Sequence, residues 1–322
     1  STQAKTLFPY TTLFRSFASS STRQTNCDTG VVQYGDADLA VQDQDNLQTV
    51  AAVYLYALTG ETRFQDRVRS SYRAMRPYND IGWNRYLPEQ GSALLFYAAL
   101  PSADAALKAT IRTDKLNDAN NSAGKVYGLN AGDDPYRAFL HPDQYHWGSN
   151  QPRANYGNTN IDAVRLGLAG KKADALRNRA LGILNYFHGV NPFGMVYLSN
   201  MSSYGATRSV DSLFHTWFRP KSKWSRVGES ECGPAPGYVP AGPNRGAAKE
   251  GVPDKIQPPA GQPPQKSFKD WNEPEGAAWV ISEPGIYYQS AYVRLLAAFA
   301  TPGSPAAPAA VEKQAEAPKS DK

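Results

Sequence analysis

The chain has 322 residues, of which 41% are hydrophobic and 11% aromatic, so it can bury a core and is not expected to be disordered as a whole. The formal net charge of +5 comes from scattered Lys and Arg rather than from a basic run interleaved with aromatic residues, which argues against a nucleic-acid-binding protein. No segment reaches the apolar length of a transmembrane helix, and Cys27 and Cys232 lack metal-ligand spacing. The 19 Tyr and six Trp offer flat faces with polar edges, as sugar-binding clefts and many interfaces require.

The N-terminal stretch TLFPYTTLFRS, residues 6–16, is unlike the rest of the chain. Its short apolar run is broken by Pro9, is too short to span a membrane and lacks the cleavage site of a signal peptide. It resembles the in-frame translation of a common sequencing-adapter oligonucleotide; the alternative is a genuine N-terminal loop or strand. We therefore expect residues 1–30 to be an artefactual and polar segment, and the true upstream sequence to be missing.

The first predicted helix covers DNLQTVAAVYLYALTG, residues 45–60. Leu47, Ala51 and Leu55 recur at a spacing of four, which places them on one stripe of a helix. Gly60 follows as a stop signal, because glycine readily takes the left-handed conformation that ends helices.

Further helices follow in consecutive pairs with short links. This pattern predicts an all-α array whose hairpins pack on one another, and the absence of strand–helix alternation argues against an α/β fold. Ser102 is the expected N-cap at the junction inside the second of these segments. The segments are residues 61–75, 92–111 (two helices meeting at Pro101 and Ser102), 154–170, 173–189 and 286–300, the last with Ile286, Val293 and Leu296 among its apolar positions.

Residues 31–302 form the expected body of the protein, and residues 303–322 an expected disordered tail of Ala, Pro, Lys and Glu. Within the body, the stretch from residue 191 to 270 is rich in Gly, Pro, Tyr and Trp and nearly free of helix patterns. Long irregular segments inside a compact domain usually carry function, so we expect the functional site there.

Four stretches and a Gly-Pro-Asn loop resemble glycoside hydrolase family 9, and the resemblance covers about residue 35 to residue 300 in the family's order. The resemblance implies inverting endoglucanases and cellulases built on an (α/α)6 barrel, of which this chain is the C-terminal part. The motifs are HWGSNQPRANYG (146–157), YFHGVNPFGMVYLSN (186–200), FHTWF (214–218), Gly-Pro-Asn (242–244) and the WVISEPGIYYQS end of KDWNEPEGAAWVISEPGIYYQS (269–290).

The resemblance implies cleavage of β-1,4-glucosidic bonds in cellulose or related β-glucans. Inverting hydrolysis needs an acid to protonate the leaving oxygen and a carboxylate base that activates water. Glu283 matches the family's general acid, and its apolar and aromatic neighbours favour the protonated form by desolvation. The alternative is a first-turn helix residue favoured by the helix dipole, with Pro284 at the first helical position.

Four further residues carry implied substrate contacts. His215 and Trp217 fall on the family's His-x-Arg motif, with Trp in place of Arg, so His215 remains the expected hydroxyl-binding residue. Trp147 matches a tryptophan that stacks on a glucosyl ring. Asp270 resembles an Asp that precedes the acid, although the spacing to the acid is longer here. A core-packed His215 and a core-packed Trp147 are the alternatives.

The family's base belongs to an Asp-Ala-Gly-Asp motif that nothing in this sequence matches. Asp36 and Asp38 lie in a Gly-Asp-Ala-Asp stretch of similar composition, but we interpret them as turn and N-cap residues. We therefore expect this chain not to catalyse inverting hydrolysis efficiently. Two other hypotheses remain open: a six-hairpin glycosidase or lyase acting on another polysaccharide, and a non-catalytic glycan-binding protein.

The remaining expectations concern partners and location. We expect a β-glucan polysaccharide or oligosaccharide as the partner, no nucleic acid, no membrane and a monomer. Secretion, extracellular or periplasmic, follows from the family alone, with the signal peptide absent from this fragment. No cofactor is expected; family members often carry structural calcium, but no Asp-rich loop here has convincing ligand spacing, so no metal is assigned.

Overall fold

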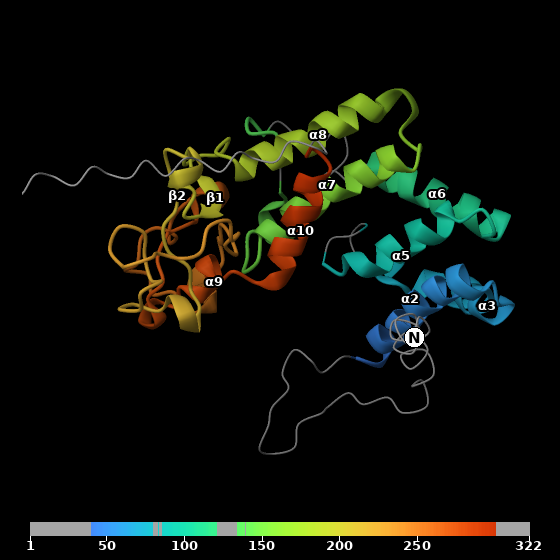
Figure 1. The fold of residues 1–322 in the computed structure, drawn as a ribbon, viewed down its shortest axis with the longest axis horizontal. Helices are drawn as coiled ribbons and strands as arrows, with labels where there is room; N and C mark the ends of the chain where they lie inside the picture. Colours follow the sequence, from blue (N-terminus) through green and yellow to red (C-terminus); the bar gives the residue numbers. More distant parts are fainter. Residues whose placement is uncertain (1–39, 80–82, 84–85, 121–133, 139, 301–322) are drawn as a thin grey trace, which may run out of the picture.

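The computed structural model describes residues 40–79, 83, 86–120, 134–138 and 140–300. The expected adapter segment, the predicted tail, Cys27, Asp36 and Asp38 lie outside these residues. Helices form one side of the molecule and an irregular lobe forms the other, on the left in Figure 1.

The first helices pack as two hairpins around one buried apolar cluster that includes Leu55, Phe64 and Leu94. The predicted stop at Gly60 is confirmed: its φ is 71° and its N–H donates to the carbonyl of Tyr56 at 2.8 Å. These helices are α2 (Val41–Thr59), α3 (Thr62–Ser71), the short α4 (Arg76–Asn79), α5 (Pro88–Ala99) and α6 (Ala105–Asn120).

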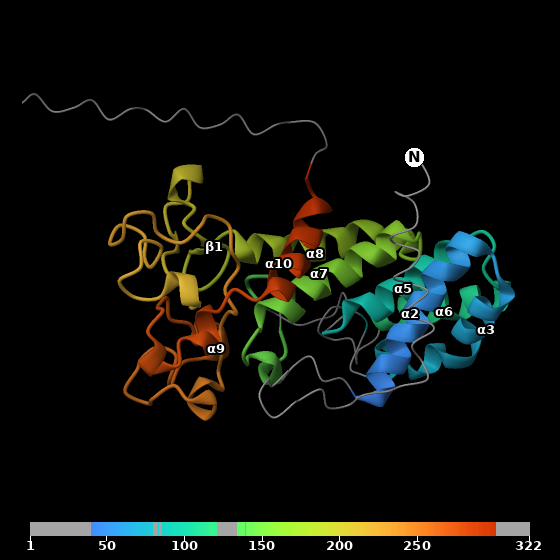
Figure 2. The same cartoon turned by 60° about the horizontal axis from the view of Figure 1, so that its bottom comes forward.

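The second buried cluster joins the remaining long helices to the lobe. Figures 1 and 2 show α7 and α8 side by side, with α10 packed across them. Helix α7 is buried on almost every side, which makes it the central element of this half. The three helices are α7 (Asn150–Arg165), α8 (Ala173–Phe187) and α10 (Ile286–Ala297).

The irregular lobe covers residues 188–285, in agreement with the prediction for residues 191–270. It holds 3-10 turns, the four-residue helix α9 (Trp279–Ser282) and a small parallel pair, β1 (Val196–Ser199) and β2 (Ser209–Val210), that the sequence pattern did not predict. Asn191 shapes the Asn-Pro turn: its amide donates to the carbonyls of Tyr186 and Met195, and its carbonyl accepts the Phe193 N–H. This motif is therefore structural.

Two sequence predictions about helices are wrong in detail. Asp104, not Ser102, caps α6, because its carboxylate accepts the Leu107 N–H at 2.8 Å while the Ser102 carbonyl accepts the Tyr56 hydroxyl. In α10, Ile286 and Val293 are 84% and 57% exposed. The face of α10 that packs inward instead carries Tyr288, Ala291, Tyr292 and Leu295.

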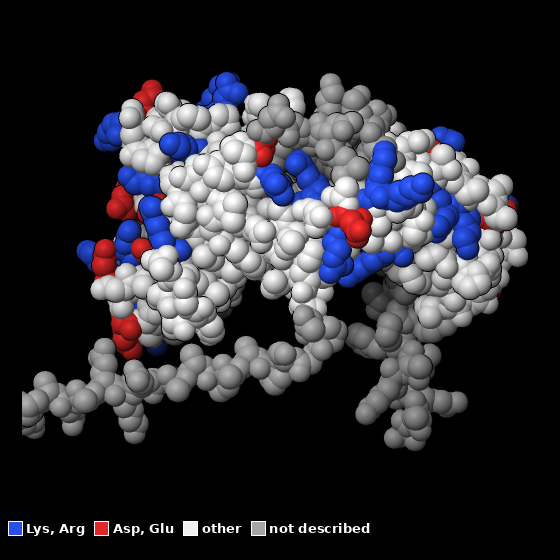
Figure 3. Space-filling view, turned by 90° about the horizontal axis from the view of Figure 1, so that it is seen from above, with Lys and Arg blue, Asp and Glu red and all other residues white. Residues whose placement is uncertain are grey.

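Charged side chains are spread over the surface. On the face shown in Figure 3, Lys and Arg form several separate groups, with Asp and Glu between some of them. None of the helices that the structure describes is long and apolar enough to cross a membrane.

Candidate active site

Glu283 lies in the extended link between α9 and α10. Its backbone has φ −65° and ψ 132°, and its N–H donates to the Trp279 carbonyl at 3.3 Å, which closes α9. A residue before proline is driven into this extended region by the proline ring. Helix α10 begins only at Ile286, with Gly285 as its N-cap, so neither Glu283 nor Pro284 lies in its first turn. The alternative in which Glu283 is a first-turn helix residue is therefore wrong.

Trp147 holds this carboxylate. Its indole Nε1 donates to Glu283 Oε2 at 2.8 Å. The ring is half-buried, and its edge-on aromatic neighbours are Trp279, Tyr287 and Tyr288, at centroid distances of 6.1, 6.1 and 6.4 Å. Such T-shaped contacts orient a ring without covering both of its faces.

Trp147 also lines an open cavity of about 490 Å³. Sequence reasoning missed two other residues of this wall, Tyr86 and Glu89, since no periodic or motif signal marks a residue that reaches a cavity from the start of a helix. The lining residues are Tyr86, Leu87, Pro88, Glu89, Trp147, Gln151, Tyr287 and Ser290. Three aromatic rings and several polar groups thus share one concave surface, which is the chemistry of a sugar-binding cleft.

The segment before α7 is fixed on both sides of Trp147. The ring of His146 bridges the Tyr86 hydroxyl and the Trp147 carbonyl, each at 2.7 Å. Ser149 Oγ donates to the Pro243 carbonyl at 2.7 Å, and Asn150 Nδ2 donates to the Pro240 carbonyl at 3.0 Å. The Trp-Gly-Ser-Asn motif is therefore bound directly to the Gly-Pro-Asn loop.

The Gly-Pro-Asn loop continues to α9. The Gly242 N–H donates to the Ile281 carbonyl at 2.9 Å, and Asn244 Nδ2 donates to the Val280 carbonyl at 3.1 Å. Gly242 has φ 104°, and a Cβ on it would lie 2.5 Å from the side-chain Cγ of Asn150, so only glycine fits. Three motifs that are distant in sequence thus form one scaffold that fixes both Trp147 and Glu283.

His215 follows a segment that is bonded to the chain just before the acid. The Phe214 N–H donates to the Ser282 carbonyl at 3.1 Å, so the residues that precede His215 and Glu283 are held together. His215 is extended and exposed, so the core-packed alternative is wrong. Trp217 is 71% exposed and its ring meets the His215 ring edge-on at 6.1 Å.

Asp270 has partners within the chain for both carboxylate oxygens. Oδ2 accepts the Asp211 N–H at 2.6 Å, and Oδ1 accepts the Ser212 N–H and hydroxyl at 3.0 and 2.7 Å. Desolvation by burial outweighs these bonds and raises the pKa of Asp270 above its ordinary value. The geometry favours a positioning role for Asp270, since it anchors the segment that leads to His215; a contact with substrate stays a prediction.

Gln289, in α10, also has a structural role. Its side chain accepts the Val239 N–H at 2.8 Å and donates to the Val239 carbonyl at 2.7 Å. It therefore ties α10 to Val239, three residues before the Gly-Pro-Asn loop begins.

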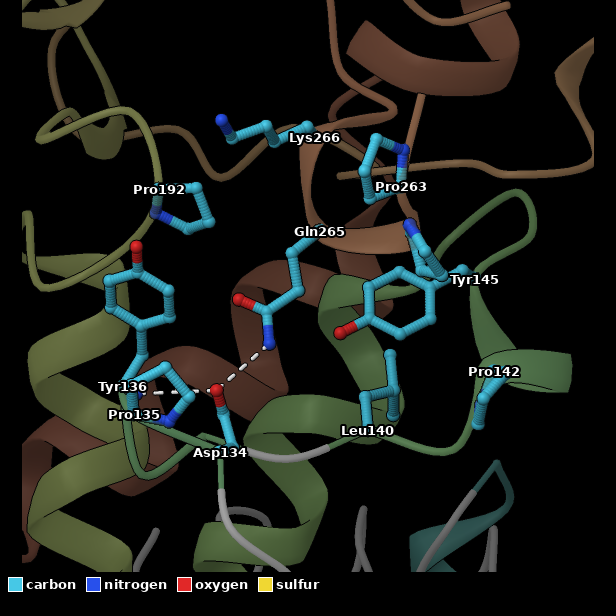
Figure 4. A pocket seen from close by; sticks show the side chains of 11 residues that line it. Asp134, Pro135, Tyr136, Leu140, Pro142, Tyr145, Pro192, Pro263, Gln265 and Lys266 are labelled. Carbon is cyan, nitrogen blue, oxygen red and sulfur yellow. Dashed lines mark hydrogen bonds between the residues drawn. The ribbon is translucent and has the colours of Figure 1, made fainter. Parts of the chain in front are cut away.

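A second cavity, of about 360 Å³, shares no lining residue with the first. Figure 4 shows its wall of prolines and tyrosines, with Gln265 donating to the carboxylate of Asp134 at 3.0 Å. Its acidic lining residue, Asp134, is bonded to Gln265, whereas Glu283 is bonded to an indole N–H. In the part of the chain that the structure describes, no group of three or more His, Cys, Asp or Glu residues is arranged to hold a metal.

Comparison with known proteins adds a family match and a set of similar folds. A family model described as "Glycosyl hydrolase family 9" matches residues 1–296, a span that includes residues 6–16. No curated protein sequence matches the chain.

Several solved structures resemble the chain, including the following three. A metagenome-derived glycoside hydrolase family 9 endoglucanase is 19% identical, with a TM-score of 0.64 over 88% of this chain and 45% of that one. The protein AaCel9A, solved in complex with a cellobiose-like isofagomine, is 18% identical, with a TM-score of 0.58 over 84% of this chain and 45% of that one. A thermostable endoglucanase mutant from Alicyclobacillus acidocaldarius is 19% identical, with a TM-score of 0.60 over 83% and 46% of the two chains. The chain thus spans less than half the length of these proteins, and the predicted partial barrel of paired helices is confirmed.

Proposed function

The chain belongs to glycosyl hydrolase family 9, and we propose that it supplies the acid half of an enzyme that cleaves β-1,4-glucosidic bonds in cellulose or a related β-glucan with inversion. The observation that carries the proposal is the 2.8 Å bond to the Glu283 carboxylate from Nε1 of Trp147, a residue that lines an aromatic cavity. In this role the second oxygen of Glu283 delivers a proton to the leaving glucosyl oxygen.

Substrate binding is assigned to the residues around that carboxylate. Trp147 and Tyr287 line the cavity and present aromatic surface to the C–H face of a pyranose. His215, which is exposed and follows the bond from Phe214 to Ser282, hydrogen-bonds a sugar hydroxyl. Trp217 extends this surface outward, and Asp270 acts by positioning the segment that carries His215.

Inversion also needs a carboxylate base about 6.5–9.5 Å from the acid, with room for a water between them. No Asp-Ala-Gly-Asp motif occurs in the sequence to provide it. We therefore propose that the chain on its own binds glucan and hydrolyses it inefficiently. We also propose a secreted location, because a polymer such as cellulose is found outside the cell. A monomeric state is part of the same proposal.

The test is calorimetric titration of the chain with cellopentaose, together with Trp147→Ala and Glu283→Gln. Loss of a stacking ring is expected to weaken binding about tenfold, whereas the Glu283→Gln side chain keeps the shape of the site and most of the affinity. Tyr204→Ala is the matched control, because Tyr204 is 69% exposed and lines a different cavity.

The outcomes separate the hypotheses. Weaker binding by Trp147→Ala alone supports a glucan cleft at Glu283. Binding that both variants leave unchanged would place any glycan site elsewhere on the protein. A third outcome is that the chain binds glucan but shows no Glu283-dependent hydrolysis, even when an external nucleophile replaces the base. That outcome would favour the non-catalytic glycan-binding hypothesis.

A further inference from the structure

A loop that follows His215 gathers positive charge and exposed aromatic surface. We call residues 215–226 the basic aromatic loop. Its two tryptophans, Trp217 and Trp224, are 71% and 38% exposed, far more than tryptophan usually is in a folded protein. Its four cations are Arg219, Lys221, Lys223 and Arg226. Over the whole sequence the positive charge is scattered, so this concentration is a local exception to that pattern.

The shape of the loop is fixed from beneath. The buried side chain of Asn272 donates from Nδ2 to the carbonyls of Phe218 and Ser225, at 2.6 and 2.9 Å. Ser222 Oγ donates to the Trp217 carbonyl at 2.8 Å and accepts the Trp224 N–H at 3.3 Å. The two tryptophans are therefore held by one small network.

The backbone between the tryptophans is strained. Lys221 has φ 69°, a left-handed conformation that costs a residue with a Cβ about 1 kcal/mol or more. Strain of this kind persists where the surrounding structure requires it, often at ligand-binding sites. Here it turns the chain so that Lys221 and Lys223 remain exposed.

Most of this positive charge has no acidic partner. Arg226 Nε lies 3.2 Å from Glu229, but Arg219, Lys221 and Lys223 form no ion pair with any residue that the structure describes. The Lys223 ammonium lies 4.8 Å from the centre of the Trp224 ring, a cation–π contact that leaves its charge available. Unneutralised cations beside exposed aromatic rings match a ligand that is both anionic and flat-faced.

The start of the loop is bonded to the segment that carries the acid. The loop begins at His215, and the backbone bond from Phe214 to Ser282 joins its start to the residue that precedes Glu283. A polymer that extends from Glu283 over His215 would meet Trp217 next and the cations of the loop after it.

From these observations we propose that the basic aromatic loop binds carboxylate-bearing sugar units, so that the glycan held by this protein includes uronic acid residues. Trp217 and Trp224 stack on pyranose faces, and Arg219, Lys221 and Lys223 pair with the carboxylates. This inference rests on the proposed function, because it extends the same cleft. Nucleic acid would satisfy the charges as well, but nothing about phosphate explains why the loop starts at a backbone bond to the residue before Glu283.

The test compares two oligosaccharides of equal length, cellopentaose and its counterpart with each C6 oxidised to a carboxylate, by calorimetric titration of the full chain. The variant is Lys221→Gln with Lys223→Gln, and the control is Lys171→Gln with Lys172→Gln, two exposed lysines in the 3-10 turn before α8. Thermal melts of both variants confirm folding.

The loop variant should bind the oxidised pentasaccharide about tenfold more weakly and cellopentaose equally well, since two exposed ion pairs are lost. Raising the ionic strength from about 0.05 M to about 0.5 M should remove the difference by screening. Trp217→Ala should weaken binding of the oxidised sugar about three- to tenfold.

Three results would overturn the inference: wild-type protein that binds both sugars equally, a loop variant no weaker than its control, or an oligodeoxythymidylate of matched charge bound as tightly as the oxidised sugar. The proposed function fails by a different result, cellopentaose binding that Trp147→Ala leaves intact. The two failures are therefore distinguishable.

Discussion

The indole Nε1 of Trp147 and the carboxylate Oε2 of Glu283 are hydrogen-bonded at 2.8 Å, although 136 positions separate the residues in the sequence. A donor from a rigid aromatic group fixes one oxygen of the carboxyl group and leaves the other for a substrate. The contact depends on the loop around Gly242, which is bonded to the start of α7 on one side and to α9 on the other. Each of these relationships predicts a measurable effect.

Replacing Trp147 by Phe should separate orientation of the acid from sugar stacking. The Trp147→Phe variant keeps a ring at the cavity but loses the N–H that Glu283 accepts. A hydrogen bond to a charged group contributes about 1.5–3 kcal/mol, so Glu283-dependent hydrolysis should fall about ten- to a hundredfold. Cellopentaose affinity should change much less. Equal losses in rate and affinity would mean that the indole N–H has no separate role.

Replacing Gly242 by Ala should destabilise the protein more than the same change at Gly237. Both glycines have positive φ, 104° and 92°, but a Cβ would meet the Asn150 side chain only at Gly242. Gly237→Ala should therefore cost about 1–2 kcal/mol of unfolding free energy from backbone strain, and Gly242→Ala about 3 kcal/mol or more. Chemical denaturation measures both. Equal losses of unfolding free energy would show that a Cβ at residue 242 does not clash with Asn150 at the start of α7.

Asp270 should make the unfolding free energy depend on pH. Burial raises its pKa in the folded protein, while the unfolded chain ionises near the ordinary value of about 3.9. As the pH rises from about 4, the unfolded state loses this proton first, so stability contributed by the protonated group declines until the folded-state pKa is passed.

The measurement is the unfolding free energy of wild type minus that of Asp270→Asn between pH 4 and pH 7, which should fall and then level off. Asp254→Asn, at an exposed carboxylate, serves as the control. A difference that rises with pH would mean that the three hydrogen bonds outweigh burial.

The ion pair between Arg294 and Asp162 should stabilise the packing of α10 on α7. Arg294 Nη2 lies 2.8 Å from Asp162 Oδ1, and the two side chains are 35% and 8% exposed. Arg294→Met leaves a buried carboxylate behind, at a cost of about 2 kcal/mol after allowance for the exposure of the arginine. Adding Asp162→Asn should recover part of that loss.

Arg69→Met is the matched control for this pair, because Arg69 forms exposed pairs with Asp66 and Asp104. Its removal should change the unfolding free energy by less than about 1 kcal/mol. A loss at Arg69 as large as the loss at Arg294 would contradict the importance given to burial.

Local sequence signals predicted much of this fold because they act over a few residues. Gly60 ends α2 as expected, since a left-handed residue is needed there and glycine adopts it without strain. The longer helices, α2, α3, α5, α6, α7, α8 and α10, overlap the predicted periodic segments for the same reason, whereas the four-residue helices α4 and α9 were not predicted. Ser102 failed as a cap because Asp104, two residues later, bonds to the helix instead.

The site was harder to predict because its contacts are long-range. The family resemblance pointed to Glu283 and Trp147 but not to the bond between them, which depends on the bonds of the Gly-Pro-Asn loop to α7 and α9. Tyr86 and Glu89 carry no motif and reach the cavity only through tertiary packing. The exposed position of Trp217 likewise depends on the distant side chain of Asn272.

Hydrolysis of aryl β-cellobiosides in the presence of azide, a nucleophile that needs no general base, tests the central assignment of Glu283 most directly. A 2,4-dinitrophenyl leaving group departs without protonation, whereas a phenyl leaving group requires the acid. Glu283→Gln should therefore cleave the dinitrophenyl glycoside at nearly the wild-type rate, release an α-configured azide product, and lose most of its activity on the phenyl glycoside. Equal losses on both substrates would contradict the assignment of Glu283 as the general acid.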